Sequence, residues 1–153
     1  MSDIFSSVGT KVSVADAAPA TYDETGFAAL TWALCGELAE LPSYGAEAAL
    51  ATHTPLATGV VAKRRGSKNF GSLALTMAIS ETDAGAAILE TTADADAGAD
   101  AQVSVKVEFP SGRIQYFTSQ VMSFKTNASN ADSITMGEVT LEIDNTVVKV
   151  AAP

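Results

Sequence analysis

Residues 52–80, THTPLATGVVAKRRGSKNFGSLALTMAIS, decide the fold of this chain. Apolar residues in the second half alternate with small or polar ones, at Leu73, Leu75, Met77 and Ile79. This period of two predicts a strand with one buried face. The first half is polar, is punctuated by glycine, and holds four of the nine basic residues, namely Lys63, Arg64, Arg65 and Lys68. We therefore predict a contact arm joined directly to a β scaffold.

The composition is that of one acidic domain, which we place over residues 1–153. A chain of this length buries roughly two thirds of its extended-chain surface on folding. Its 18 acidic residues outnumber its 9 basic ones and give a net charge of −9. The averaged surface therefore repels phosphates, which disfavours tight binding to duplex nucleic acid.

The cysteine count and the hydropathy of the chain restrict which classes of protein it can belong to. Cys35 is the only cysteine, so an internal disulfide and a multi-cysteine zinc site are excluded, and we expect a small buried side chain. No basic segment precedes an apolar run at the N-terminus, and no later segment approaches 18 uninterrupted apolar residues. We expect neither a signal peptide nor a membrane span.

Upstream of the opening stretch, an N-terminal arm over residues 1–11 leads into an edge strand over 11–15. An irregular crossing follows, with room for one helical turn, and a second strand over residues 32–41 ends at Pro42. Residues 43–69 are predicted as a long contact loop. Loops longer than about 12 to 15 residues are usually functional or disordered, and a flexible β-ribbon in which residues 57–62 extend is a second interpretation.

Downstream, a flanking helix is predicted over residues 82–95, capped by Thr82 or Asp83. A β-hairpin follows, with strands over 103–109 and 114–125 around the turn Pro110-Ser111-Gly112. The last strand ends at Ile143, and a tail covers 145–153. The predicted class is mainly β: an antiparallel β-sandwich or barrel with one flanking α-helix, a long inter-strand loop and extended terminal arms.

The strand over 114–125 does not alternate cleanly. Its apolar face is predicted to hold Ile114, Tyr116, Met122 and Phe124, and its polar face Arg113, Gln115, Ser119, Ser123 and Lys125. Phe117 and Val121 fall on the polar face. This apolar pair indicates that another surface covers part of that face.

The sequence lacks the residues of the common catalytic sets, so we expect no enzyme activity and no cofactor. His53 is the only histidine and stands in a polar loop, whereas Ser-His-Asp and Cys-His sets need a positioned histidine. Phosphate-binding glycine motifs are absent as well. The carboxylates Asp94, Asp96 and Asp100 resemble the opening of a calcium loop, but Val105 occupies the position of the bidentate glutamate. We predict no metal site.

The basic cluster has two interpretations. It is either a solvated loop or a surface that binds phosphates or an acidic partner. Six carboxylates and no basic residue lie between Glu81 and Asp100. Copies of the chain could therefore associate head to tail, basic loop against acidic region.

Three stretches carry a resemblance to a known family: GTKVSVADAAPATYDETGFAALTW, GELAELPSYGAEAALATHTPLATGVVAKRRGSKNFGSLALTM, and FTSQVMSFKTN followed by ITMGEVTLEID. Together they resemble the tail tube (major tail) proteins of long, non-contractile-tailed bacteriophages and of gene transfer agents (GTAs). The resemblance covers nearly the whole chain, and its motifs are structural.

The resemblance implies hexameric rings that stack into a tube, through which DNA passes from capsid to host. It implies ring-to-ring contacts at Lys63, Arg64, Arg65 and Lys68, in the N-terminal arm and in the C-terminal tail. Implied partners are further copies of the chain, a tape measure protein, a tail terminator and baseplate or distal tail proteins. The implied location is the virion tail, assembled in the host cytoplasm.

Small-polar or acidic strand faces could line the water-filled bore of such a tube. The candidate lining residues are Thr76, Ser80, Glu108, Gln115, Ser119, Thr140 and Glu142. Two other functions stay open: the tube protein of a contractile injection or secretion system, and a carbohydrate- or calcium-binding β-sandwich module.

Overall fold

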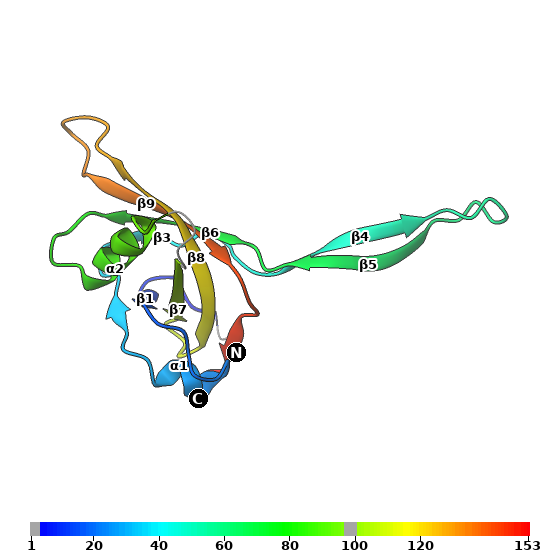
Figure 1. The fold of residues 1–153 in the computed structure, drawn as a ribbon, viewed down its shortest axis with the longest axis horizontal. Helices are drawn as coiled ribbons and strands as arrows, with labels where there is room; N and C mark the ends of the chain where they lie inside the picture. The colour runs from blue at the N-terminus through cyan, green and yellow to red at the C-terminus, as the bar shows by residue number, and fades with distance from the viewer. Residues whose placement is uncertain (1–3, 97–100) are drawn as a thin grey trace.

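The computed structural model describes residues 4–96 and 101–153. In this part of the chain a curled antiparallel sheet of eight strands holds the core, and a two-stranded ribbon projects from it (Figure 1). The main path of the curled sheet is β2-β1-β7-β8-β9-β6-β3, with β10 paired to β8. The predicted class, a mainly antiparallel β fold with a flanking helix, is confirmed.

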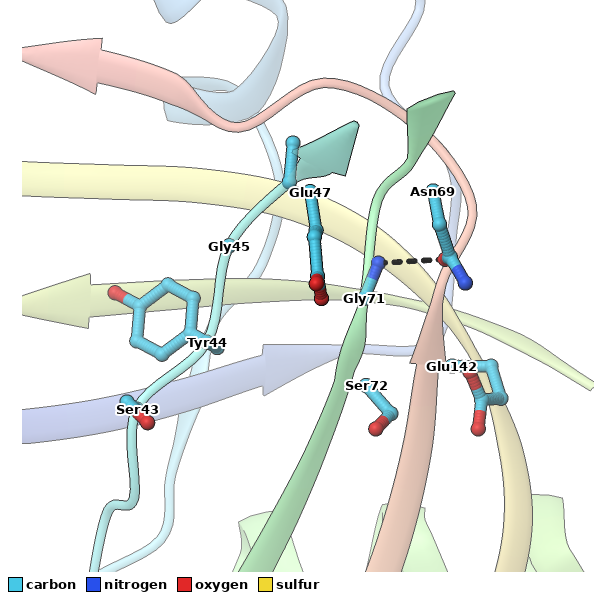
Figure 2. A pocket seen from close by; sticks show the side chains of 9 residues that line it. Ser43, Tyr44, Gly45, Glu47, Asn69, Gly71, Ser72 and Glu142 are labelled. Carbon is cyan, nitrogen blue, oxygen red and sulfur yellow. Dashed lines mark hydrogen bonds between the residues drawn. The ribbon is translucent and has the colours of Figure 1, made fainter. Parts of the chain in front are cut away.

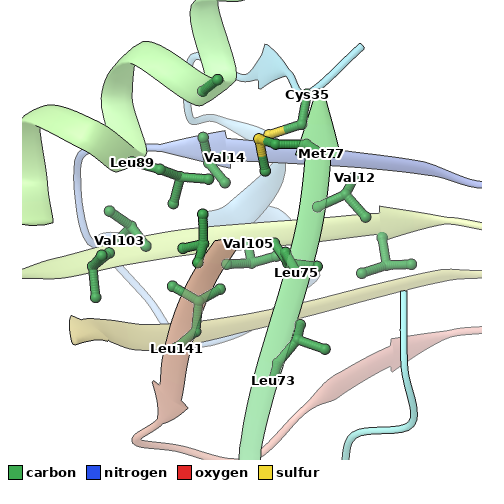
Figure 3. Close-up of a cluster of buried hydrophobic side chains, with 14 of the residues drawn as sticks. Val12, Val14, Cys35, Leu73, Leu75, Met77, Leu89, Val103, Val105 and Leu141 are labelled. Carbon is green, nitrogen blue, oxygen red and sulfur yellow. The ribbon is translucent and has the colours of Figure 1, made fainter. Parts of the chain in front are cut away.

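The long strands of the curled sheet turn one face toward a shared core. Their bounds are β1 Lys11–Ala15, β2 Ala33–Leu34, β3 Leu38–Glu40, β6 Ser72–Ala78, β7 Gln102–Glu108, β8 Ile114–Asn127, β9 Met136–Ile143 and β10 Val148–Val150. The alternation of β6 continues across the register, where Leu73 faces Leu141 and Leu75 faces Val139. These side chains and the valines of β1 and β7 form a single core inside the curl (Figure 3).

The predicted strand over 32–41 was wrong, because the chain turns in its middle. Its first part, β2, pairs with β1 at one end of the sheet, and its second part, β3, pairs with β6 at the other end. Hydrogen bonds continue both pairings: Cys35 donates N–H to Val12 O at 2.9 Å, and Ala78 donates to Glu37 O at 3.0 Å. One stretch therefore joins the two edges and nearly closes the sheet.

Two helices cover different sides of this sheet. α2, Ala84–Ala93, corresponds to the helix predicted over 82–95, and its N-cap Asp83 accepts a hydrogen bond from Ala86 N–H at 3.3 Å. Its fully buried Leu89 joins the core. The short α1, Glu24–Ala28, packs instead on the outer face of β8, where Phe27 stacks on Tyr116 with ring centroids 5.1 Å apart.

The face assignment of β8 was wrong. Phe117 and Val121 are buried in the core, so their face is the core face, and Tyr116 is buried from the opposite side by α1. The register shifts between Val121 and Ser123. This bulge leaves Met122 61% exposed and turns Phe124 back toward the core.

The predicted C-terminal tail contains a strand. After β9, the chain forms β10, which pairs with residues 114–116 of β8. The join is held by Asp144, whose carboxylate accepts hydrogen bonds from Thr118 Oγ1 and from Gln102 Nε2, the latter at 2.9 Å. The tail is thereby fixed along the sheet.

Candidate assembly surfaces

The predicted contact loop is an ordered β-ribbon. Its strands are β4, Glu47–His53, and β5, Ala62–Asn69, and the tip closes where Gly59 donates N–H to Pro55 O at 2.9 Å. β4 and β5 therefore do not coincide with residues 57–62, which the sequence suggested as the extended part of a ribbon. The ribbon, here called the hairpin (residues 47–69), extends far from the curled sheet (Figure 1).

The hairpin has no core of its own. Every β5 residue is exposed, and in β4 only Ala48 is partly covered. Leu50, in the middle of β4, is 66% exposed. An isolated two-stranded ribbon is at best marginally stable in water, because it buries too little apolar surface. The hairpin therefore gains little stability from its own side chains.

The base of the hairpin is rigidly built. Tyr44 packs on Phe117 with ring centroids 5.4 Å apart, and its hydroxyl donates to Gln115 Oε1. Burial raises the pKa of Tyr44 to about 12. Gly71 has φ +92°, and a Cβ there would lie 2.4 Å from Gly45 O. Only glycine fits this crossing of the two hairpin ends.

An open hollow of about 680 Å³ lies at this base (Figure 2). Glu47 and Glu142 contribute carboxylates to its lining, and Asn69 Oδ1 accepts a hydrogen bond from Gly71 N–H at 2.9 Å beside them. The hollow is polar and open to solvent, and the curled sheet and the hairpin meet there.

All four basic candidates lie on β5 and are exposed. Two of them contact nearby residues of the same chain: Lys68 Nζ lies 5.4 Å from the ring centroid of Phe70, just after β5, and Arg64 Nη1 donates to Lys63 O at 2.8 Å. The N-terminal arm, one of the two other predicted contacts, exposes the apolar side chains of Ile4, Phe5 and Val8.

Three of the candidate lining residues share one face of the adjacent strands β6 and β9. Thr76 pairs with Glu138, and Thr140 and Glu142 follow at alternate positions of β9. All of them lie opposite the core face. Glu138 and Ser72 belong to the same surface but were not predicted, although the alternation that includes Thr140 and Glu142 also includes Glu138.

The other candidates lie elsewhere. Ser80 follows β6, and its hydroxyl is 3.1 Å from Thr82 Oγ1. Glu108 is on the outer face of β7, where its carboxylate lies 2.8 Å from Lys106 Nζ. Gln115 is on the core side of β8, bonded to Tyr44. The prediction for Ser119 was wrong. Its side chain is fully buried on the core face, so it cannot line a water-filled bore.

The histidine and the aspartates considered for catalysis and metal binding are exposed where the structure describes them. His53 is an exposed residue of β4. Within residues 4–96 and 101–153, no three His, Cys, Asp or Glu side chains are grouped so that they could hold a metal ion. Asp94 and Asp96 are exposed, and Asp100 lies outside the described residues. No helix of the described part is long and apolar enough to cross a membrane.

Sequence comparison finds no matching family model and no matching curated protein. Structural comparison matches nearly the whole chain. The sheath/tube terminator of PVC, an extracellular contractile injection system, has a TM-score of 0.65 at 12% identity, with 97% of each chain covered. A chain of the anti-feeding prophage baseplate has a TM-score of 0.67 at 11% identity, with 99% of each covered.

A third match comes from the tail of an empty GTA particle with C6 symmetry. It has a TM-score of 0.61 at 14% identity and covers 92% of this chain and 95% of that one. The chain has a tail-tube-like fold. Contractile injection systems and a GTA tail both contain it, so the fold does not single out non-contractile phage tails.

Proposed function

We propose that this chain is a non-enzymatic, structural subunit of a phage-like tail tube. Copies self-assemble into hexameric rings, and the rings stack into a conduit for DNA between capsid and host cell. The hairpin carries the proposal. It forms a regular two-stranded ribbon that is almost wholly exposed and has no core of its own. A subunit whose hairpin is covered by a neighbour would have this arrangement.

The exposed face of β6 and β9 is the proposed bore lining. It combines small polar residues with Glu138 and Glu142 and lies opposite the core face. DNA binding depends on neutralising phosphates. An acidic wall therefore lets DNA slide without being held.

The proposal includes the remaining partners of a tail. A tape measure protein would occupy the bore before DNA, and a tail terminator and baseplate or distal tail proteins would close the two ends. The particle tail, assembled in the host cytoplasm, is the proposed location.

Negative-stain electron microscopy of concentrated protein tests the proposal. We expect rings or tubes from the wild-type chain. The matched control replaces residues 48–68 with an Asn-Gly turn, because Glu47 and Asn69 are register partners and a two-residue turn joins such strands. This variant should keep the circular dichroism of the curled sheet and form no tubes. Wild-type particles that remain monomeric at high concentration would contradict the proposal.

A tube protein of a contractile injection system is the second candidate. It is favoured by matches to PVC and anti-feeding prophage components, including a PVC sheath-tube complex matched with a TM-score of 0.60. A sheath gene and a secretion ATPase gene beside the coding gene would support it. The ligand-binding module rests on the acidic run alone, and calorimetry without heat on adding calcium would remove it.

A further inference from the structure

The hairpin has two unlike faces, and the difference follows from its register. Thr52 pairs with Lys63, Leu50 with Arg65, and Ala48 with Lys68. Paired residues point to the same side of an antiparallel ribbon, and positions two apart in a strand share that side. The three pairs therefore form one face, here called the basic face: Ala48, Leu50, Thr52, Lys63, Arg65 and Lys68.

A β-bulge makes this grouping possible. In a regular strand, Arg65 and Lys68 would point to opposite sides because they are three positions apart. The register shifts between Ala48 and Leu50, so two residues of β5 lie opposite the single Ala49 of β4. The extra residue returns Lys68 to the side of Arg65.

Arg64 lies on the opposite face, paired with Ala51. Its guanidinium already donates to Lys63 O at 2.8 Å, and Glu47 is on the same face by alternation. That face has no net charge, whereas the basic face has three cations around the exposed Leu50.

The acidic counterpart is the C-terminal end of α2. Glu90 and Asp94 are exposed and four positions apart, Asp96 follows, and the last turn has no basic residue. Carboxylates at a helix C-terminus are destabilised by the helix dipole, and like charges four apart repel. A cationic partner would relieve both effects. α2 lies on the opposite side of the curled sheet from the hairpin (Figure 1), so this partner comes from another copy.

We propose that the basic face of the hairpin docks on the acidic end of α2 of a second copy, and that Arg64 takes no part. This inference rests on the proposed function, since it names the two surfaces that join subunits. The contact is heterologous, so it can repeat through an assembly. Leu50 supplies apolar contact at its centre, while the charges select the partner and the register.

Neighbouring arginines provide a matched test. Arg65→Glu and Arg64→Glu make the same charge change at adjacent exposed positions. We expect Arg65→Glu to raise the protein concentration needed for tubes at least about tenfold, equivalent to about 1.4 kcal/mol, and Arg64→Glu to change it less than about twofold. Light scattering and electron microscopy give the readout, and circular dichroism verifies the fold.

A charge swap tests the partner surface. Tubes should be lost when the basic face is reversed by Lys63→Glu, Arg65→Glu and Lys68→Glu together. They should return when the same chain also carries Glu90→Lys and Asp94→Lys. Equal loss in Arg64→Glu and Arg65→Glu, with wild-type tubes intact, overturns the face assignment alone. Failure of the swap to restore tubes overturns the choice of α2. A wild-type chain that never assembles overturns the proposed function and this inference with it.

Discussion

The curled sheet and the hairpin are both antiparallel, yet they are stabilised differently. The strands of the curled sheet bury one face in a shared core, whereas the hairpin buries neither face. The hairpin holds four of the nine basic residues and one of the 18 acidic ones, so the rest of the chain is strongly acidic. The curled sheet packs around its own core, whereas the hairpin buries no core and would be covered only in the proposed assembly.

The largest effect should separate the two regions by stability. Phe117 is fully buried in the core and packs against Tyr44. Phe117→Ala should lower the free energy of unfolding by about 3–5 kcal/mol, because it removes a buried ring and leaves a cavity. Leu50→Ala, on the exposed hairpin, should change it by less than about 0.5 kcal/mol. Urea unfolding followed by Trp32 fluorescence measures both, and equal losses would contradict the comparison.

Substitution at the base of the hairpin, where the two regions join, should lower the free energy of unfolding nearly as much. Gly71→Ala would force a positive φ on alanine and place its Cβ against Gly45 O. We expect a loss of roughly 2–3 kcal/mol. Strain reaches the curled sheet because Ile143 donates N–H to Gly71 O at 2.9 Å.

Gly59 at the hairpin tip is the control for this joint. Its φ is +65°, but no atom lies within 4 Å of an added Cβ. Gly59→Ala should cost about 1 kcal/mol within the tip and leave the unfolding midpoint of the curled sheet unchanged. A Gly71→Ala protein that unfolds like wild type would show that the base is not rigid.

The same contrast explains what the sequence could predict. β6, β7 and β9 were found because each turns alternate apolar side chains toward the core. Ser104 on the outer face of β7 is also buried, but it is polar and leaves the apolar alternation intact. β4 and β5 bury neither face, so their residues have no period, and only their charge drew attention. The bulge that groups Lys68 with Arg65 leaves no periodic trace either.

Other failures came from contacts between distant segments. In β8, α1 covers Tyr116 on one side while the core covers Phe117 on the other, so burial on both sides hid the true face. In residues 32–41 the alternation continues through the turn at 36–37, although β2 and β3 pair with opposite ends of the sheet. No local pattern encodes either arrangement.

A pH titration should act on the core of the curled sheet through Cys35. Burial, and then the charge of Asp83, raises the pKa of the Cys35 thiol from its ordinary 9.0 to about 12. The folded chain therefore holds this proton more tightly than the unfolded chain. The resulting stability is complete below pH 9 and is lost as pH rises toward 12, by about 1.4 kcal/mol per pH unit.

Cys35→Ala provides the comparison for this titration. Between pH 8 and 10 its free energy of unfolding, from urea curves, should fall less than that of wild type. Some decline should remain, because burial also raises the pKa of Tyr44 to about 12. Parallel declines in the two proteins would show that the Cys35 thiol ionises as easily folded as unfolded.

The smallest effect concerns Ser119, which was predicted to line a bore but is buried in the core. The Ser119 hydroxyl is fully buried in the curled sheet and has no hydrogen-bond partner among the described residues. An unpaired buried hydroxyl costs free energy, so Ser119→Ala should stabilise the protein by roughly 1 kcal/mol. Thr140→Ala, on the exposed face of β9, should stay within about 0.5 kcal/mol of wild type. A destabilised Ser119→Ala variant would mean that the hydroxyl is paired in solution, for example by a buried water, and that the core is less dry there than its side chains indicate.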